Sequence, residues 1–461
     1  MIKLRDYQEN LIQKLRERFA AGKKRLLLQL PTGAGKTILA ADMLKGASTK
    51  GNNALFIVHR MELLEQTAEA LKIFDIPHGI IASGYRYVPG HRVYIASIQT
   101  LVRRLHIIDN IKIVFFDECH HIAAGSWKKV FSSFPKSWVI GLTATSIRLD
   151  GKGLSEFFDE IIQGPSVQSL IDQGYLSRYR YFAPEYLNTA ALRVRMGEFL
   201  QEDLEEALNS VTITGKAIDE YKKHGEDGQF IVFAVSIAHS IHIVEEFDKH
   251  GISARHVDGT MKKKERLAIM EMFRNRDISV LSNVNLFGEG VDIPDLKGIL
   301  MLRPTKSLSL YLQMCGRALR PSPGKDCAII LDHSNNIYEH GSPCEDRLWT
   351  LRGCKSGETK LKECPRCFAH VPIGAEVCTT PGCGYEFTPI QIEAPKKERE
   401  IEPLEGKLEE IDVGEINRLR KREQALARDF DSLLALGKKR GYKHPAGWAR
   451  HPLKARALRE Q

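Results

Sequence analysis

A glycine-rich turn follows the first strongly apolar run of the sequence, Leu26–Leu30. The turn reads Pro31, Thr32, Gly33, Ala34, Gly35, Lys36 and Thr37. Glycines where a strand turns into a helix let backbone N–H groups wrap phosphate oxygens, and the helix adds its positive N-terminal end. We expect Lys36 to reach the β- and γ-phosphates of a nucleoside triphosphate and Thr37 to ligate Mg²⁺. Leu30 stands where the strict pattern has a glycine, outside the cradle itself.

Two adjacent carboxylates, Asp117 and Glu118, end a second apolar run. At the carboxyl end of a strand, Asp117 can hold Mg²⁺ through water, and Glu118 can polarise the attacking water as a general base. Acidic pairs after strands are common in loops, so this pair indicates little alone. Together with the phosphate cradle it predicts hydrolysis of the bound nucleotide.

Asp117-Glu118-Cys119-His120 resembles the DExH box of superfamily-two helicases, and the remaining motifs of that family follow in order between Ile2 and Asp332. The matching segments are Leu4–Gln8, Ile57–Arg60, Ala96–Thr100, Thr143–Thr145, Phe233–Ser236, Gly288–Pro294 and Gln313–Arg320. In the numbering of that family the DExH box is the second motif, and the last two segments resemble the fifth and sixth motifs. The resemblance is closest to the RadD-like DNA repair helicases, which also append cysteines after the motor. The second motif differs from the Asp-Glu-Ala-Asp of DEAD-box RNA helicases.

The resemblance implies roles for individual residues. Arg5 and Gln8 would contact the adenine of ATP. His120 and Gln313 would belong to the catalytic machinery, and Gly290 and Asp292 of the fifth motif would help to bind the nucleotide. The sequence numbers of these residues all fall inside the matching motifs.

Arg317 and Arg320 stand three residues apart, which places them on one face of a helix. A guanidinium is a planar fork of donors that stays charged, so it suits the negative charge that develops on a γ-phosphate. The resemblance implies that both arginines enter from the second half of the chain as arginine fingers. In isolation, such a pair is more often a feature of a solvated helix surface.

Short apolar strands alternate with amphipathic helices in both halves of the chain, which predicts an α/β fold with parallel sheets. The resemblance makes these two tandem RecA-like domains, followed by a small zinc module and a basic helical tail. Expected strands are Leu26–Leu30, Ala54–His59, Val93–Ser97, Ile113–Asp117, Trp138–Leu142, Phe230–Ala234, Ala254–Val257, Val280–Leu281, Ile299–Leu302 and Ala328–Leu331.

The expected organisation has seven segments. These are a helicase ATP-binding domain over 1–164, a bridge over 165–210, a helicase C-terminal domain over 211–340, a connector over 341–360, a zinc-ribbon-like module over 361–390, a charged linker over 391–415 and a basic tail over 416–461. The tail contains one expected helix, Glu415–Leu436.

Four of the nine cysteines cluster, with C-x₂-C spacing at Cys364 and Cys367 and C-x₄-C spacing at Cys378 and Cys383. Four thiolates in two close pairs suit a tetrahedral structural Zn²⁺. A segment this short cannot build a core of its own, so a metal is the natural staple. Free thiols or a single disulfide-capable pair are the alternatives. The module could grip nucleic acid, bind a partner protein or brace the motor.

The formal net charge of +9 is concentrated in the tail, where 416–461 carries 13 Lys and Arg against 4 Asp and Glu. A basic segment with Tyr442 and Trp448 suits nucleic acid, because cations neutralise phosphates and aromatic rings stack on unpaired bases. A helical cap packed on the motor is the equally weighted alternative. No apolar run approaches the ~20 residues of a membrane span. We expect a soluble, cytoplasmic protein that binds no membrane.

These observations predict an ATP-dependent helicase or translocase that moves on DNA, in repair or recombination, with ATP, Mg²⁺ and Zn²⁺ as cofactors. DNA is expected ahead of RNA, and a protein partner for the zinc module or tail stays open. An RNA helicase is the first alternative, because phosphate tracking does not read the base. The second is a zinc-containing DNA-binding adaptor that uses ATP only as a switch.

Overall fold

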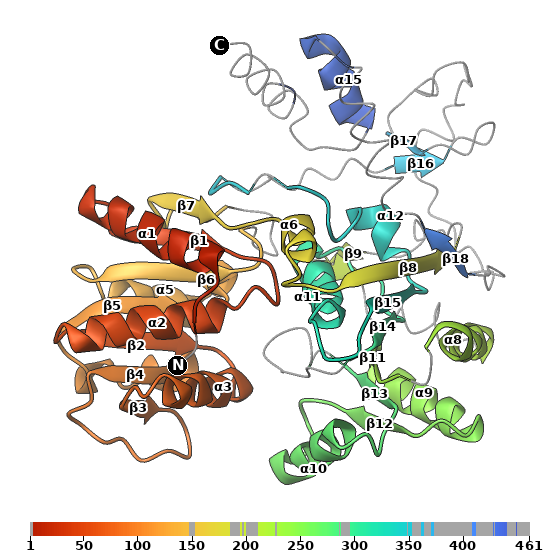
Figure 1. The fold of residues 1–461 in the computed structure, drawn as a ribbon, viewed down its shortest axis with the longest axis horizontal. Helices are drawn as coiled ribbons and strands as arrows, with labels where there is room; N and C mark the ends of the chain where they lie inside the picture. Colours follow the sequence, from red (N-terminus) through yellow and green to blue (C-terminus); the bar gives the residue numbers. More distant parts are fainter. Residues whose placement is uncertain are drawn as a thin grey trace.

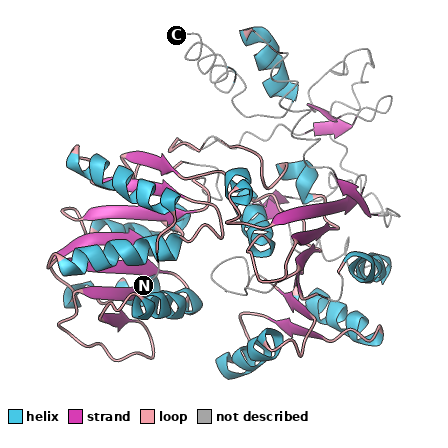
Figure 2. Cartoon of the chain, in the orientation of Figure 1, coloured by secondary structure: helices cyan, strands magenta, loops and turns pink. Residues whose placement is uncertain are grey.

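The computed structural model describes residues 3–146, 153–184, 194–195, 198–199, 211–225, 228–284, 286, 296–347, 349–352, 361–363, 370–372, 408–411, 427, 429–439 and 449. Figure 1 shows two bodies, one coloured red to orange and one coloured green to teal, joined by a yellow segment. In Figure 2 each body has helices packed against a central sheet. We call the first body lobe 1 and the second lobe 2.

Lobe 1 is built around a fully parallel sheet in the order β3-β4-β2-β5-β6-β1-β7. Its strands are β1 Arg25–Gln29, β2 Asn53–Val58, β3 His78–Ile81, β4 Val93–Ser97, β5 Ile111–Phe116, β6 Trp138–Thr143 and β7 Glu160–Gln163. Its helices are α1 Asp6–Ala20, α2 Lys36–Thr49, α3 Met61–Ile73, α4 Ile98–Leu101 and α5 Gly125–Ser132, with the short turns η1 Leu105–Ile107 and η2 Cys119–His121. The segments after β1, β5 and β6 therefore meet at one edge of the sheet.

Lobe 2 has a second sheet in the order β12-β13-β11-β14-β15-β8-β18, parallel except for its last strand. Its strands are β8 Arg178–Pro184, β11 Phe230–Phe233, β12 Ala254–Val257, β13 Val280–Asn283, β14 Gly298–Met301, β15 Cys327–Asp332 and β18 Leu408–Ile411. Its helices are α8 Val211–His224, α9 Ile237–Lys249, α10 Lys263–Arg274, α11 Leu308–Ala318 and α12 Asn336–His340. Helix α6, Val167–Asp172, lies between the lobes in Figure 1.

All the expected strands are present, and their ends differ from the expected ones by at most two residues. In the two seven-stranded sheets, the sequence reasoning missed four others, of which β3 and β7 extend the sheet of lobe 1. Strand β8 comes from the expected bridge 165–210, and β18 comes from the expected charged linker 391–415 and pairs antiparallel with β8. Lobe 2 therefore draws strands from segments far apart in the chain.

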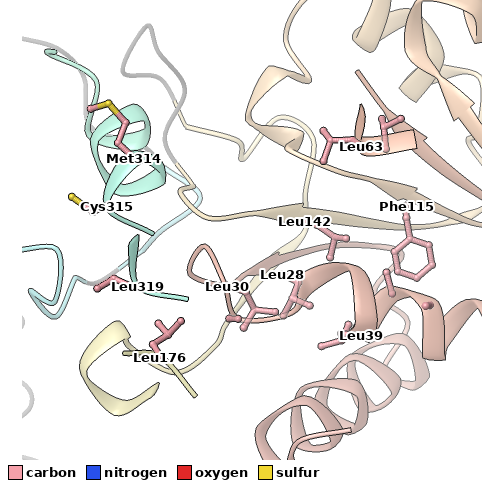
Figure 3. Close-up of a cluster of buried hydrophobic side chains, with 14 of the residues drawn as sticks. Leu28, Leu30, Leu39, Leu63, Phe115, Leu142, Leu176, Met314, Cys315 and Leu319 are labelled. Carbon is pink, nitrogen blue, oxygen red and sulfur yellow. The ribbon is translucent and has the colours of Figure 1, made fainter. Parts of the chain in front are cut away.

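Central strands are buried on both faces, which explains why they read as continuous apolar runs. In β5, Phe115 packs in one hydrophobic cluster, whereas Val114 and Phe116 pack in another on the opposite face. The cluster that contains Phe115 extends across the lobes. Figure 3 shows Leu30 of lobe 1, Leu319 of lobe 2 and, beside them, Leu176 from the connection after α6.

A segment that we call the strap, residues 341–352, runs back from lobe 2 to lobe 1, as the teal trace in Figure 1 shows. At its start, the Tyr311 hydroxyl donates to the Gly341 carbonyl at 3.0 Å. At its far end, the Leu351 carbonyl accepts from the backbone N–H groups of Leu154 and Ser155 at 2.8 and 2.9 Å. Between them, the Gln163 amide of β7 donates to the Arg347 carbonyl at 3.0 Å. The strap therefore ties both lobes together by the main chain.

Several expected sites lie outside the described residues: Cys364, Cys367, Cys378 and Cys383, Gly290 and Asp292, and most of the basic tail. Of the tail, the structure describes helix α15, Phe430–Lys439. Strands β16, Leu361–Glu363, and β17, His370–Pro372, pair antiparallel around the first two cysteines. Among the described residues no group of three or more His, Cys, Asp or Glu side chains is placed to hold a metal, and no helix is both long and apolar enough to span a membrane.

Phe115→Ala should lower the free energy of unfolding of lobe 1 by about 3–5 kcal/mol, because Phe115 is fully buried and stacks on Phe56. Hydrogen exchange of the β5 amides, read by mass spectrometry along a urea series, reports this lobe directly. Val88→Ala is the matched control, since Val88 is 48% exposed, and it should change the free energy by less than about 0.5 kcal/mol. Equal protection in the two variants would contradict the assignment of Phe115 to the core.

Candidate nucleotide site

The phosphate cradle lies between β1 and α2. Gly33 and Gly35 have positive φ angles of 85° and 74°, a conformation that side chains rarely adopt. Helix α2 begins at Lys36 with Gly35 as its N-cap. The Lys36 ammonium donates to the Leu30 carbonyl at 3.3 Å, so the side chain folds back over the loop. The loop therefore has the backbone geometry that a phosphate cradle requires.

Residues of the expected adenine motif contact this loop directly. Gln8 is buried, and its amide nitrogen donates to the carbonyls of Ala34 and Gly35 at 3.3 Å each. The Tyr7 hydroxyl donates to the Ala34 carbonyl at 2.7 Å. Arg5 is the N-cap of α1, and its backbone N–H donates to the Gln8 amide oxygen at 3.0 Å. A movement of the Ala34 or Gly35 carbonyl would therefore break hydrogen bonds to the first turn of α1.

The two carboxylates follow β5, which is separated from β1 by β6 alone. Asp117 and Glu118 are both buried, and Glu118 has a positive φ of 46°, a strained backbone conformation that clusters at functional sites. Burial and the neighbouring Glu118 raise the pKa of Asp117 to about 7, while Lys36 and His59 act in the opposite direction. Two buried carboxylates beside one lysine suit a hard divalent cation, which would return Asp117 to its ionised form.

A chain of polar contacts leads from Glu118 to lobe 2. Nδ1 of His120 lies 3.3 Å from a Glu118 carboxylate oxygen and 3.2 Å from the Thr143 hydroxyl. The Thr143 hydroxyl donates to the Thr145 carbonyl at 2.7 Å. The Thr145 hydroxyl in turn donates to the Ser309 hydroxyl of α11 at 2.8 Å. The second motif and the helix of the sixth motif are therefore connected through Thr143–Thr145.

Helix α11 packs directly on the cradle. A Cβ atom placed on Gly316 would lie 2.4 Å from the Thr32 Cβ, so only glycine allows this approach. Gln313 and Arg317 are buried on the same helix. Arg320 follows it, and its Cγ would lie 3.7 Å from a Cβ on Gly33. Burial lowers the pKa of Arg320, but a guanidinium stays charged near neutrality.

Away from the cradle, lobe 1 and lobe 2 meet again through charged side chains. Arg60 donates to the Leu286 carbonyl at 3.1 Å. Glu62 and Glu65 of α3 pair with Arg266 and Lys263 of α10 at 2.6 and 2.5 Å. Gln99, of the third matching segment, donates to the His59 carbonyl at 2.7 Å. The expected strand-contacting motifs thus lie next to this ion-paired crossing.

The structure brings together almost all of the expected site within its described residues. The contact of α11 with the cradle brings together the phosphate loop, the two carboxylates, His120, Gln313, Arg317 and the expected adenine motif Leu4–Gln8. Gly290 and Asp292 lie outside the described residues. Sequence reasoning missed Tyr7, Ser309 and the connection after α6. Tyr7 was visible inside its motif, whereas a serine such as Ser309 has no signal of its own.

Two family models match the chain. The model described as "Type III restriction enzyme, res subunit" matches residues 1–148, and the "Helicase conserved C-terminal domain" matches residues 211–322. The first covers most of lobe 1 and the second covers most of lobe 2. Residues 149–210, which include α6 and β8, belong to neither model.

Curated proteins with similar sequences include a helicase and a translocase. A "51.5 kDa protein" of a Lactococcus phage is 33% identical over 369 residues, covering 78% of both chains. IRC3 of Saccharomyces cerevisiae, which carries the name of an ATP-dependent helicase, is 32% identical over 71% of this chain and 51% of its own length. The "DNA 3'-5' translocase XPB2" of Sulfurisphaera tokodaii is 27% identical over 69% of this chain and 79% of its own.

Solved structures share the fold. An HsdR-type subunit fragment of a type I restriction enzyme from Vibrio vulnificus YJ016 superimposes with a TM-score of 0.60 at 22% identity, over 73% of this chain and 65% of that one. Two parallel-sheet RecA-like lobes, the two family models and the helicase relatives lead to one conclusion. The chain belongs to the superfamily-two helicases, which are ATP-hydrolysing enzymes.

Proposed function

We propose that this protein is a DExH-type motor in which ATP hydrolysis between the two lobes drives movement along DNA. The observation that carries the proposal is the contact of Gly316 with Thr32, because it places the helix of the sixth motif on the phosphate cradle. A nucleotide in that cradle touches both lobes, so its binding and hydrolysis change the free energy of their contact.

The roles follow from the positions of the side chains. Lys36 and the loop amides hold the phosphates, and Glu118 orients the attacking water. Arg317 and Arg320 supply positive charge from lobe 2 to the γ-phosphate, where such groups contribute ~10³–10⁵ in rate. His120 and Gln313 link the two halves of this machinery. Gln8 and Arg5 contact the adenine base of ATP.

Thr37 and Asp117 would hold Mg²⁺ in this scheme. The ion supplies charge neutralisation for the β- and γ-phosphate oxygens when it is bound. The raised pKa of Asp117 fits this use. It shows that Lys36 alone does not offset burial and the neighbouring Glu118, so a further cation is needed to keep Asp117 ionised.

The inter-lobe ion pairs support a nucleic-acid track. Arg60, Lys263 and Arg266 lie at the crossing, and two of them are neutralised by Glu65 and Glu62. The Lys263–Glu65 pair is exposed, and exposed ion pairs contribute little stability, so a phosphate can replace the Glu65 carboxylate at small cost. DNA is favoured over RNA by the name of the translocase XPB2 and by the resemblance to RadD-like repair helicases, which also suggests repair or recombination.

We further propose that Cys364, Cys367, Cys378 and Cys383 hold a structural Zn²⁺. The antiparallel pairing of Glu363 with His370 supports this, because it brackets the C-x₂-C pair in one short connection. Together with the basic tail, the module offers a second surface for DNA or for a protein partner.

ATPase rates measured with single-stranded DNA, duplex DNA, branched DNA and RNA test the function. DNA should stimulate the rate strongly, and the stimulation should fall as salt rises, because phosphate contacts release counterions. Stimulation by RNA alone would establish the first alternative, an RNA helicase. A rate that no nucleic acid changes would support the adaptor that uses ATP as a switch.

Arg317→Ala should retain ATP binding and lose hydrolysis by about 10³-fold or more, because the loop amides and Lys36 still hold the nucleotide. Lys36→Ala should abolish turnover, because it removes the ammonium that holds the β- and γ-phosphates. Lys3→Ala is the control, since Lys3 is exposed near the N-terminus. Single-turnover hydrolysis and equilibrium binding of ATP distinguish the variants. Wild-type turnover in Arg317→Ala would reject its role as an arginine finger.

Metal analysis of purified protein should give about one zinc per chain, and Cys364→Ser with Cys367→Ser should remove it, because a tetrahedral site needs all four thiolates. Cys327→Ser is the matched control, because Cys327 is a free cysteine in β15. Full zinc occupancy in the double variant, or zinc near zero in the wild type, would reject the module.

A further inference from the structure

The connection between the lobes carries three consecutive residues that each contact a different part of the nucleotide site. It follows α6 and comprises Tyr175, Leu176 and Ser177. Both family models leave this segment uncovered. The backbone turns at Gly174, with a φ of 74°, and the N–H groups of Tyr175 and Leu176 return to the Leu170 carbonyl at 2.8 and 3.1 Å. The backbone at Tyr175 and Leu176 is therefore held against α6.

Tyr175 contacts the base motif. The guanidinium carbon of Arg5 lies 4.5 Å from the centre of the Tyr175 ring. The rings of Tyr7 and Tyr175 meet edge to face, with centres 5.4 Å apart. An Arg5 guanidinium nitrogen also donates to the Tyr7 hydroxyl at 3.2 Å. Stacking on one face and one hydrogen bond at the edge fix the plane of the guanidinium.

Leu176 and Ser177 contact the cradle and the sixth motif. Leu176 is buried, and its Cδ2 would lie 3.0 Å from a Cβ on Gly33. The Ser177 N–H donates to the Leu319 carbonyl at 2.8 Å, and its hydroxyl donates to the Arg320 carbonyl at 3.2 Å. Tyr175 is thus held between the base motif on one side and the arginine-bearing end of α11 on the other.

The orientation of Arg5 matters because the Gln8 amide is already engaged. Its oxygen accepts from the Arg5 N–H and its nitrogen donates to two cradle carbonyls. A base that binds Gln8 must exchange these partners, whereas a guanidinium held in one plane meets a purine edge with its donors already oriented. Preorganised donors discriminate well between bases, because a mismatched edge leaves buried polar groups unpaired.

We propose that Tyr175 is a positioning residue for nucleobase selectivity, which holds Arg5 in the plane that recognises adenine. This inference rests on the proposed ATP site. Loss of the ring frees Arg5 and weakens the binding of ATP, while guanine nucleotides, which the oriented fork does not match, bind as before.

Equilibrium binding of ATP and GTP to the full chain without nucleic acid tests the proposal, together with KM and kcat for both nucleotides. Tyr175→Ala should weaken ATP binding and raise its KM about tenfold, the effect of a stacked cation–π contact. GTP binding and kcat at saturating ATP should change less than about twofold. Tyr175→Phe retains the ring and should retain wild-type selectivity.

Arg5→Lys provides a second variant, because it keeps the charge and loses the planar fork. It should reduce selectivity as Tyr175→Ala does, and the double variant should lose little more, since the two residues act as one unit. An unchanged ratio of ATP to GTP affinity in folded Tyr175→Ala would overturn the inference. The same result in Arg5→Lys would also overturn it. Failure of nucleic acid to stimulate ATPase would leave this binding result intact and would count against the motor alone.

Discussion

The structure depends on one close approach, that of helix α11 to the phosphate cradle. A triphosphate carries more negative charge than the cradle and Lys36 can neutralise, so the site needs cations from elsewhere. The absence of a side chain at Gly316 lets the backbone of α11 reach Thr32, and Arg320, which follows this helix, lies beside Gly33 of the cradle. In the proposed motor, the missing charge comes from a different body from the one that holds the phosphates.

The two lobes contact each other at two places, and the two contacts differ in chemistry. At the cradle the contact is apolar and buried, with Leu30, Leu176 and Leu319 in one cluster. At the crossing of α3 and α10 it consists of ion pairs that solvent and salt weaken. In the proposed motor, opening the ion-paired side would cost less free energy than separating the apolar side.

Sequence reasoning predicted the parts of the fold that local pattern determines. Strands such as β2 and β15 are buried on both faces and therefore read as apolar runs. Strand β8, with alternating arginine and aromatic residues, owes its place to pairing with β15 and β18, which no local pattern encodes. The acidic edge strand β18 resembles a linker because edge strands carry charge. In the site, the motif residues have a spacing that phosphate chemistry fixes. Tyr175 contacts Arg5, which lies far from it along the chain, and no local pattern encodes that contact.

Because of the strap, the chain returns to lobe 1 after lobe 2. Because residues 341–352 leave lobe 2 and end on the backbone of Leu154 and Ser155, the order of segments along the chain differs from the order of bodies in space. The next segment of chain starts its path from the anchor on lobe 1, while β18, further on, returns to the sheet of lobe 2. Leu351, which is bonded to lobe 1, and Leu408, which lies in the sheet of lobe 2, are therefore on different bodies. A change in the angle between the lobes therefore changes the distance between these two points of the chain.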